Sequence, residues 1–267
     1  MPELPEVNTL VTALSRRLRG DSIIAWQRRS PKLRGPIPDS TEAGVLTDRK
    51  IVDIRRIAKS IYFDFGCSQL LKVHLGMTGY FLLTSESCPE AKHAHLMLRL
   101  ASGQMLTFCD SRRFGSIEIT SWPDKVVVEP FKSKLTATYL ATACNSRQCS
   151  IKALIMDQHI IAGLGNIYAS EALFKAGIRP DRSAGSLKPT EIKKLCSACI
   201  AVIDAAIKAG NASFGDKPEI DRGTTHFAIE TCVYDQQNQI CQKCQKSKIA
   251  MVRISGRSSC FCPTCQK

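Results

Sequence analysis

The first six residues, Met1 to Glu6, contain the groups best suited to covalent chemistry. Aminopeptidases remove Met1 when a small residue such as proline follows, and removal gives Pro2 a free secondary amine beside the Glu3 carboxylate. An α-amino group titrates near pH ~7.7–8.0 against ~10.4 for a lysine side chain, so roughly a hundredfold more of it is unprotonated at neutral pH. When such an amine condenses with an aldehyde, the iminium accepts electrons in an elimination at the neighbouring carbon. The competing interpretation is a disordered, proline-containing terminus that caps a helix.

Four cysteines near the C-terminus have the spacing of a metal site. Cys241-x-x-Cys244 and Cys262-x-x-Cys265 are two pairs with seventeen residues between them, which suits tetrahedral zinc with each pair on a tight turn. Four thiolates leave no open coordination position, so we expect one Zn²⁺ ion with a structural role. Cys260 lies close by but does not keep the paired spacing. The alternative is a set of reduced, buried cysteines.

The composition points to a polyanionic partner. The chain has 267 residues, with 37 Lys and Arg against 24 Asp and Glu and a net charge of +13, a balance that favours nucleic acid. Glu3 and Glu6 precede any apolar run, unlike a secretory signal, and no stretch approaches the ~18–20 apolar residues of a membrane span. The odd number of cysteines, thirteen, then predicts a reducing cytoplasm, with Cys196-x-x-Cys199 assigned to core packing.

The first half of the chain predicts one helix followed by short strands. Residues Glu6–Arg19 carry an apolar stripe at helical spacing, with Pro5 in the first turn and Gly20 at the end, so a helix would hold the terminal amine. From Ile23 to about Thr120, short apolar runs separated by glycines predict an antiparallel β-sandwich or barrel. The predicted strands are Ile51–Ile54, Ile61–Phe65, Leu70–Val73, Tyr80–Leu83, Leu96–Leu100 and Ile117–Ile119.

From about Pro130 the pattern becomes helical. The predicted helices are Lys132–Cys144, Ile151–Met156, Ile167–Lys175 and Pro189–Lys208. Asn211–Gly223 is polar and lacks periodicity, which predicts a loop. Phe227–Tyr234 is strand-like, and the residues between the two cysteine pairs predict a hairpin that turns at Ser255-Gly256.

Five motifs in the same order resemble bacterial formamidopyrimidine-DNA glycosylase, nearly from end to end. They are Pro2-Glu3-Leu4-Pro5-Glu6-Val7, His74-Leu75-Gly76-Met77-Thr78-Gly79, Arg112-Arg113-Phe114-Gly115, Asp157-Gln158 with Ala162 to Glu171, and the finger with Arg257 and Cys262-Pro263-x-Cys265-Gln266. The resemblance implies an α+β fold in three parts: an antiparallel β-sandwich with an N-terminal helix (residues 1–130), a helix–two-turn–helix domain with a lesion loop (131–223), and a β-hairpin zinc finger (224–267).

The resemblance implies base-excision repair of damaged double-stranded DNA by an enzyme that is both glycosylase and lyase. Pro2 would attack C1′ of a flipped nucleotide, expel an oxidised purine such as 8-oxoguanine or a formamidopyrimidine, and hold the sugar as a Schiff base. Glu3 would protonate the ring oxygen, and Lys59 would contact the lesion phosphate and assist a β,δ-elimination. We expect a monomer in the cytoplasm, associated with the nucleoid when bound to DNA.

The resemblance also assigns a wedge to the two loop motifs. Met77, Arg112 and Phe114 would fill the gap that the flipped base leaves, because apolar side chains can unstack a duplex. On the residues alone, Met77 and Phe114 are typical of side chains at the edge of a core.

Further DNA contacts are implied on the second half of the chain and before one strand. Asn166 and Arg257 would grip phosphates, and Lys92 would lie near the DNA. Without the resemblance, Lys59 is interpreted as a solvated lysine at a strand end, and Asn166 as the N-cap of a helix.

Two departures from the family pattern leave the lesion class open. Ser111 stands where proline is common, and residues 210–216 are Gly-Asn-Ala-Ser-Phe-Gly-Asp where the family carries Gly-Gly-Thr-Thr-Leu-Arg-Asp. One alternative is an endonuclease VIII-like glycosylase for oxidised pyrimidines, against which Leu4 and the two loop motifs argue. The other is a non-catalytic zinc-ribbon DNA-binding protein, which has no reason to keep Pro2, Glu3 and Lys59 together.

Overall fold

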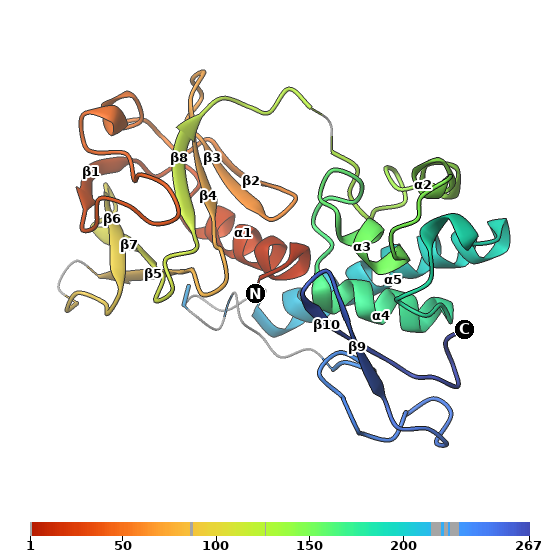
Figure 1. Ribbon diagram of the computed structural model, residues 1–267. Helices are drawn as coiled ribbons and strands as arrows, with labels where there is room; N and C mark the ends of the chain where they lie inside the picture. Colours follow the sequence, from red (N-terminus) through yellow and green to blue (C-terminus); the bar gives the residue numbers. More distant parts are fainter. Residues whose placement is uncertain (1, 86–87, 126, 215–219, 222–223, 225–229) are drawn as a thin grey trace. The chain divides into compact units, whose positions relative to one another are not determined.

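The computed structural model describes the chain apart from residues 1, 86–87, 126, 215–219, 222–223 and 225–229, and apart from the side chains of residues 213–214. The chain forms two compact units. The first unit comprises Met1–Val126 with Ala209–Phe227, and the second comprises Val127–Lys208 with Ala228–Lys267. Figure 1 labels their helices and strands.

Helix α1 (Leu4–Leu18) opens the first unit and begins two residues before the predicted start. A reciprocal capping box fixes that start: the Glu3 N–H donates to Glu6 Oε2 at 2.8 Å, and the Glu3 carboxylate accepts the Glu6 N–H. Two donors that a helix N-terminus would leave unpaired are satisfied in this way. The predicted apolar stripe is confirmed, since Val7, Leu10 and Leu14 are fully buried.

Two four-stranded antiparallel sheets make the rest of this unit, and the predicted sandwich is confirmed (Figure 1). One sheet has the order β1-β6-β7-β5 and the other has the order β2-β3-β4-β8. The strands are β1 (Ile23–Arg28), β2 (Asp53–Ile57), β3 (Ser60–Asp64), β4 (Leu70–His74), β5 (Tyr80–Ser85), β6 (Ala94–Leu100), β7 (Gln104–Cys109) and β8 (Ser116–Thr120).

The core lies between the two sheets. Phe63 of β3 meets Phe81 of β5 edge to face with ring centroids 6.0 Å apart, and Phe81 meets Phe108 of β7 at 5.4 Å. Helix α1 packs on β2 and β3 of the second sheet. Aromatic edge-to-face pairs add to the free energy gained by burial. The chain's N-terminus is therefore carried by a helix that is held on a rigid sheet.

Strands β1 and β7 were absent from the predicted list. β7 is an inner strand of its sheet, and its residues from Met105 to Cys109 are all buried. A strand buried on both faces shows no polar–apolar alternation, so the period-2 signal is missing. β1 is an edge strand with exposed residues, and its burial does not account for its absence from the prediction.

The second unit is mainly helical. Its helices are α2 (Ala137–Cys144), α3 (Ile151–Met156), α4 (Asn166–Ala176) and α5 (Pro189–Phe214) up to Lys208, the rest of α5 belonging to the first unit. β9 (Ala250–Ile254) pairs with β10 (Arg257–Phe261) in the predicted hairpin. Two short 3-10 turns complete the described elements, Glu42–Val45 in the first unit and Ala184–Ser186 in the second.

Helix α5 is longer than predicted and takes in Asn211 to Phe214, the start of the expected loop. Gly210 weakens a helix but does not end one that neighbouring residues support. Pro189–Ala212 is also long and apolar enough to cross a membrane by length and composition, contrary to the expectation from the sequence. Core helices pass the same test, and Leu195 and Ile203 are fully buried.

The segment after α5 only partly fits the prediction. The expected strand-like stretch begins at residues 227–229, outside the described residues, and Glu230 to Tyr234 form no strand. Ile220 is buried in the core of the first unit, and its carbonyl accepts the N–H of Leu83. Part of the predicted loop is thus anchored to the edge strand β5.

Candidate functional site

Pro2 and Glu3 are fixed by the start of α1. Pro2 is buried, and Glu3 has only 1% of its surface exposed. The capping box with Glu6 sets the direction of the Glu3 carboxylate. The first unit therefore holds a carboxyl group and the residue-2 nitrogen beside each other on a rigid element, the arrangement that an amine nucleophile with a neighbouring acid requires.

Lys59 lies in the two-residue turn between β2 and β3. Ala58, the other turn residue, has a φ of 53°, as in tight hairpins. The guanidinium of Arg56 donates to the Ala58 carbonyl at 2.8 Å and reaches Asn8 Oδ1 on α1 at 3.4 Å. The turn that carries Lys59 is thus connected to the helix that carries Pro2.

His74 belongs to the same region, although sequence reasoning did not single it out. It pairs with Ser60, the residue after Lys59, across β3 and β4. Burial lowers the pKa of His74, and the positive charges of Lys59 and Arg34 lower it further. The Gly76 N–H donates to His74 Nδ1 at 3.0 Å, which leaves the proton of the neutral ring on Nε2. A cationic lysine and an imidazole N–H close together suit an anion such as phosphate. In the sequence, the signal that could have identified His74 was its place as the first residue of the motif at 74–79.

The loops 74–79 and 110–115 lie against each other. Gly76 has a φ of 63°, and a Cβ atom there would lie 2.4 Å from the carbonyl carbon of Phe114. Only glycine permits this backbone approach. Met77 is half-buried, Phe114 is 45% exposed, and the Arg112 guanidinium lies 4.9 Å from the Phe114 ring centroid. The three predicted wedge residues are therefore carried on two touching loops of one unit.

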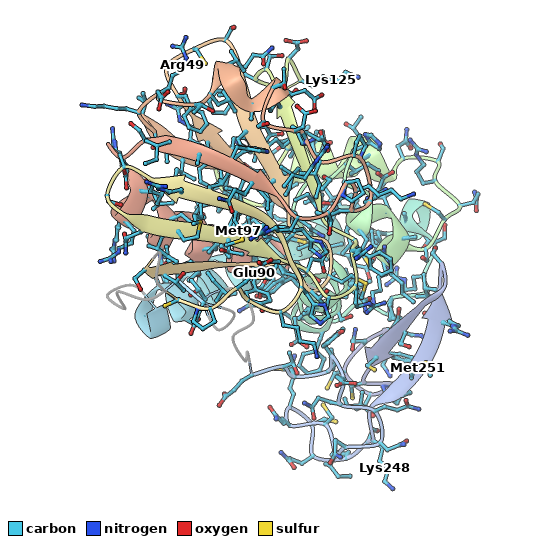
Figure 2. The ribbon with its side chains drawn as sticks, turned by 90° about the vertical axis from the view of Figure 1, so that its left-hand side faces the viewer. Arg49, Glu90, Met97, Lys125, Lys248 and Met251 are labelled. Atoms are coloured by element: carbon cyan, nitrogen blue, oxygen red, sulfur yellow. The ribbon has the colours of Figure 1, made fainter. Side chains whose placement is uncertain are left out.

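Lys92 is exposed in the turn before β6. Glu90, two residues earlier, forms a 2.9 Å ion pair with Arg29, and Arg29 also reaches Met97 Sδ at 3.4 Å. Figure 2 labels Glu90 and Met97 on this face of the sandwich. The turn is held on the β1–β6 side of the first unit.

In the second unit, Asn166 and Arg257 come from elements that touch. Asn166 is the first residue of α4, and its Nδ2 donates to the Ser258 carbonyl at 3.3 Å. Arg257, the neighbour of Ser258, is exposed at the start of β10. The N-cap of α4 is Gly165, so the N-cap interpretation of Asn166 was wrong. Within the described residues, the buried Oδ1 of Asn166 accepts no hydrogen bond.

A buried lysine holds this part of the hairpin to the helices. Lys152 of α3 is 1% exposed, and its ammonium donates to Ser170 Oγ at 2.9 Å and Ser259 Oγ at 2.8 Å. It also reaches the Ser258 carbonyl at 3.4 Å. Because a buried ammonium must keep its hydrogen bonds, α3, α4 and β10 are fixed to one another.

The four predicted zinc ligands converge. The Sγ atoms of Cys241, Cys244, Cys262 and Cys265 all lie within 4.8 Å of one another. Backbone N–H groups of Lys246 and then Ser247 lower the pKa of Cys244 to about 6, whereas burial raises the pKa values of Cys262 and Cys265. This set of four thiols fits tetrahedral zinc with no open position. Lys248 and Met251, labelled in Figure 2, lie between the two pairs on the same finger.

The segment that leads into the finger is fastened to α4 by one carboxylate. Glu171 accepts the N–H groups of Cys232, Val233 and Tyr234 at 2.9, 3.0 and 2.9 Å. Sequence reasoning placed Glu171 in a motif but gave it no role. Three successive backbone N–H groups thus donate to one carboxylate, and such charge-assisted hydrogen bonds are stronger than those between neutral groups.

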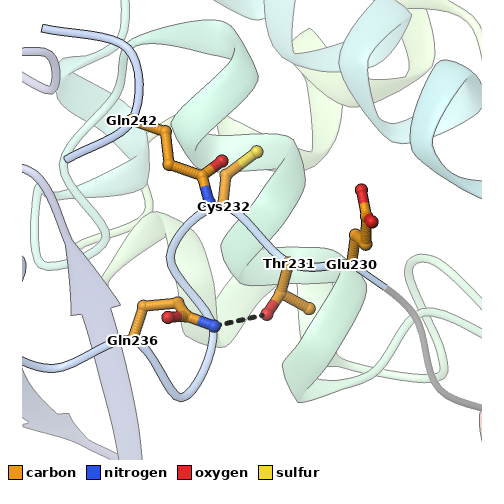
Figure 3. Close-up of a pocket in the computed structure, with 5 residues that line it drawn as sticks. All are labelled: Glu230, Thr231, Cys232, Gln236 and Gln242. Atoms are coloured by element: carbon orange, nitrogen blue, oxygen red, sulfur yellow. Dashed lines mark hydrogen bonds between the residues drawn. The ribbon is translucent and has the colours of Figure 1, made fainter. Parts of the chain in front are cut away.

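Beside this segment is a pocket of about 450 Å³, shown in Figure 3. Within it, the Gln236 side-chain amide donates to Thr231 Oγ1 at 3.4 Å. The lining residues are Glu230, Thr231, Cys232, Gln236 and Gln242. The pocket adjoins the finger and does not contain the predicted catalytic or DNA-contacting residues.

Comparison with known proteins covers the whole chain. Residues 1–117 match the family model described as the formamidopyrimidine-DNA glycosylase N-terminal domain, and residues 126–217 match its H2TH domain. The formamidopyrimidine-DNA glycosylase of Thiobacillus denitrificans is 39% identical over 273 residues, and that of Geotalea daltonii is 38% identical over 277 residues. Both alignments cover 100% of this chain and of the relative.

Solved structures give the same result. The Lactococcus lactis Fpg in complex with DNA containing an abasic site superposes with a TM-score of 0.88 at 30% identity, covering 99% of both chains. A point mutant of that protein, in complex with DNA containing Fapy-dG, superposes with a TM-score of 0.89 at 30% identity and covers 100% of both chains.

Proposed function

The chain belongs to the formamidopyrimidine-DNA glycosylase family, and on that premise we propose that Pro2, freed of Met1, is its nucleophile. The protein is a DNA-binding repair glycosylase, of a family that also has abasic-site lyase activity. Full-length similarity to glycosylases argues against the non-catalytic zinc-ribbon alternative. The observation that carries the proposal is the placement of Pro2 beside a buried, capped Glu3 on α1.

In the first step, a bond from the Pro2 nitrogen to C1′ replaces the glycosidic bond between C1′ and the base. The Pro2 nitrogen forms a bond to C1′ of the damaged nucleotide, and the glycosidic bond breaks as the base leaves with its electron pair. Glu3 then gives a proton to the ring oxygen O4′, so the C1′–O4′ bond opens and an iminium remains. This step requires Glu3 to carry a proton when the nucleotide is bound.

The iminium then drives two eliminations. Loss of a C2′ proton sends electrons toward the iminium, and the C3′–O3′ bond breaks with phosphate as the leaving group. Loss of a C4′ proton drives a second elimination that breaks the C5′–O5′ bond with phosphate leaving, and water then hydrolyses the iminium to free the sugar fragment and the Pro2 amine. Lys59 would hold the lesion phosphate, and its proximity to the N–H of His74 supports that role.

The remaining predicted residues act on the duplex. Met77, Arg112 and Phe114 would occupy the space of the extruded nucleotide, which their placement on two touching loops supports. Asn166 and Arg257 would bind phosphates, and their connection through Ser258 supports a shared task. Zinc, held by the four cysteines, would keep the finger folded. Lys92 would lie near the DNA, a placement that rests on motif resemblance.

We assign oxidised purines as the lesion class. The named relatives are formamidopyrimidine-DNA glycosylases, and a point mutant of the L. lactis protein forms a complex with Fapy-dG DNA. The last two positions of the divergent stretch 210–216 lie outside the described residues. The assignment of the lesion class therefore rests on the relatives. Excision rates on 8-oxoguanine opposite cytosine and on thymine glycol separate this assignment from the endonuclease VIII-like one. A preference for thymine glycol would reverse it.

The nucleophile is tested by trapping the Schiff base. Protein shown by mass spectrometry to lack Met1 is mixed with lesion duplex and borohydride, which reduces an iminium to a stable amine. We expect a covalent adduct whose peptide map places DNA on Pro2. Pro5→Ala, which changes the other proline of the opening, should trap equally well. An adduct on a lysine, or none from the processed protein, would refute the assignment.

A further inference from the structure

Asp110, a residue without an assigned role, is the centre of the hydrogen bonds that join the two wedge loops. It is fully buried at the end of β7. Its Oδ1 accepts the Thr78 hydroxyl at 2.5 Å and the Arg112 N–H at 3.2 Å, and its Oδ2 accepts the Gly115 N–H at 2.8 Å. Thr78 Oγ1 in turn accepts the Arg112 N–H at 3.2 Å. One carboxylate therefore reaches both loops.

The pattern of these contacts matches the three wedge residues one by one. Thr78 directly follows Met77, Gly115 directly follows Phe114, and Arg112 is bound through its own N–H. Asp110 is thus hydrogen-bonded either to each wedge residue itself or to the residue that directly follows it. We propose that Asp110, together with Thr78, is a positioning residue that holds Met77, Arg112 and Phe114 as one rigid wedge; this inference rests on the proposed function.

The backbone of Asp110 is fixed from the other side. Its carbonyl accepts Nε2–H of the buried His95 at 2.8 Å, and its N–H donates to the His93 carbonyl at 3.1 Å. The opposite ring nitrogen of His95 is 2.9 Å from Ser30 Oγ. Asp110 is therefore anchored to β6 and to the loop after β1.

Rigidity matters here because three side chains must enter one gap together. A wedge held in advance spends no binding free energy on ordering loops when DNA arrives, whereas a loose wedge does. A buried carboxylate must also keep its N–H and O–H partners, because an unpaired buried charge is costly. Asp110 and Thr78 take no part in the proposed steps at Pro2. Their loss should therefore slow excision from duplex DNA selectively.

The test uses the full-length, zinc-loaded protein with four substitutions. Thr78→Val removes the hydroxyl at nearly constant shape, whereas Thr78→Ser keeps the hydroxyl and removes only the methyl group. Asp110→Asn replaces one acceptor oxygen by a donor. Thr120→Val, at the far end of β8, is the matched control. Two substrates are compared: a duplex with 8-oxoguanine opposite cytosine, and a single-stranded oligonucleotide with a preformed abasic site, which has no base stack to open.

We expect Thr78→Val and Asp110→Asn to slow single-turnover excision from the duplex roughly ten- to a hundredfold. Cleavage of the single-stranded abasic site should stay within about twofold of the parent, since its chemistry is untouched. Thr78→Ser should recover most of the duplex rate. 2-Aminopurine beside the lesion should show a matching loss of lesion-dependent unstacking in Thr78→Val.

The inference is overturned if Thr78→Val matches Thr120→Val on the duplex, or if it loses activity equally on both substrates. Should Asp110→Asn fail to fold, Thr78→Val and its serine rescue decide alone. Failure of the proposed function is distinguishable, because then the parent protein itself would form no borohydride adduct on either substrate.

Discussion

Asn166 Nδ2 and the Ser258 carbonyl oxygen lie 3.3 Å apart, so the first turn of α4 is joined to the strand that carries Arg257. Of the two phosphate-binding candidates, Asn166 is neutral and Arg257 is cationic. That difference allows their contributions to DNA binding to be separated by salt.

Arg257→Ala should weaken duplex binding and reduce the slope of log affinity against log salt by about 0.9, the value for one displaced counterion. Asn166→Ala should weaken binding at every salt concentration and leave the slope unchanged, because an amide displaces no counterion. Fluorescence anisotropy at several salt concentrations measures both. Arg17→Ala, an exposed arginine on α1, is the control and should change neither value. An unchanged slope for Arg257→Ala would exclude a direct phosphate contact.

Zinc removal should unfold the finger before the rest of the protein. The protein should contain about one zinc ion per chain, as four thiolates bind one tetrahedral ion. Chelation, or Cys244→Ser, should lower the melting temperature and weaken duplex binding, since structural zinc contributes directly to folding. Cys88→Ser, an exposed cysteine of the first unit, should retain both zinc and affinity. Full duplex affinity in the metal-free protein would contradict a structural role for the ion.

His74 should make the stability of the protein rise with pH. Burial first, and then Lys59 and Arg34, lower its pKa in the folded state. Between that lowered value and the unfolded value of ~6.5, the unfolded chain binds more protons. The free energy of unfolding that the neutral His74 contributes is therefore fully present above about pH 6.5. It is lost as the pH falls toward the pKa of His74 in the folded state.

The urea midpoint measures this contribution. It should fall between about pH 7.5 and pH 5.5 in the parent, and it should fall less in His74→Gln. His159→Gln, at an exposed histidine, should reproduce the parent's fall. Equal falls in all three proteins would show that His74 does not couple stability to pH.

Glu171→Gln should destabilise the second unit by about 1–3 kcal/mol, because three part-buried hydrogen bonds from backbone amides lose their charged acceptor. Urea unfolding followed by far-UV circular dichroism gives the free energy. Glu230→Gln changes an exposed carboxylate of the same segment and should have little effect. If the two variants were equally stable, the three hydrogen bonds would contribute nothing net.

Much of the fold was predictable from sequence, although β1, a half-exposed edge strand, was not found. α1 was found from its apolar stripe and from Pro5 and Gly20, α3 has the predicted bounds, and the spacing of the two cysteine pairs predicted the finger. β7 was missed because burial on both faces removes its period. The end of α5 was missed because a glycine lowers helix propensity without ending every helix that contains it.

The site was predictable at the level of motifs but not at the level of contacts. Motifs named Met77, Arg112 and Phe114, yet no pattern indicates that a buried Asp110 connects all three. The relation of His74 to Lys59 likewise depends on strand register, which a single sequence does not determine. Long-range hydrogen bonds are properties of the folded chain and leave little local trace in the sequence.

The approach of Gly76 to the Phe114 backbone has a consequence for how this surface can vary or be engineered. A residue with a side chain at position 76 displaces the opposite loop, so neither loop can be exchanged alone. A transplant of these loops between relatives would have to carry residues 74–79 and 110–115 together, Asp110 included. The two loops form a single module encoded by two separate stretches of the chain.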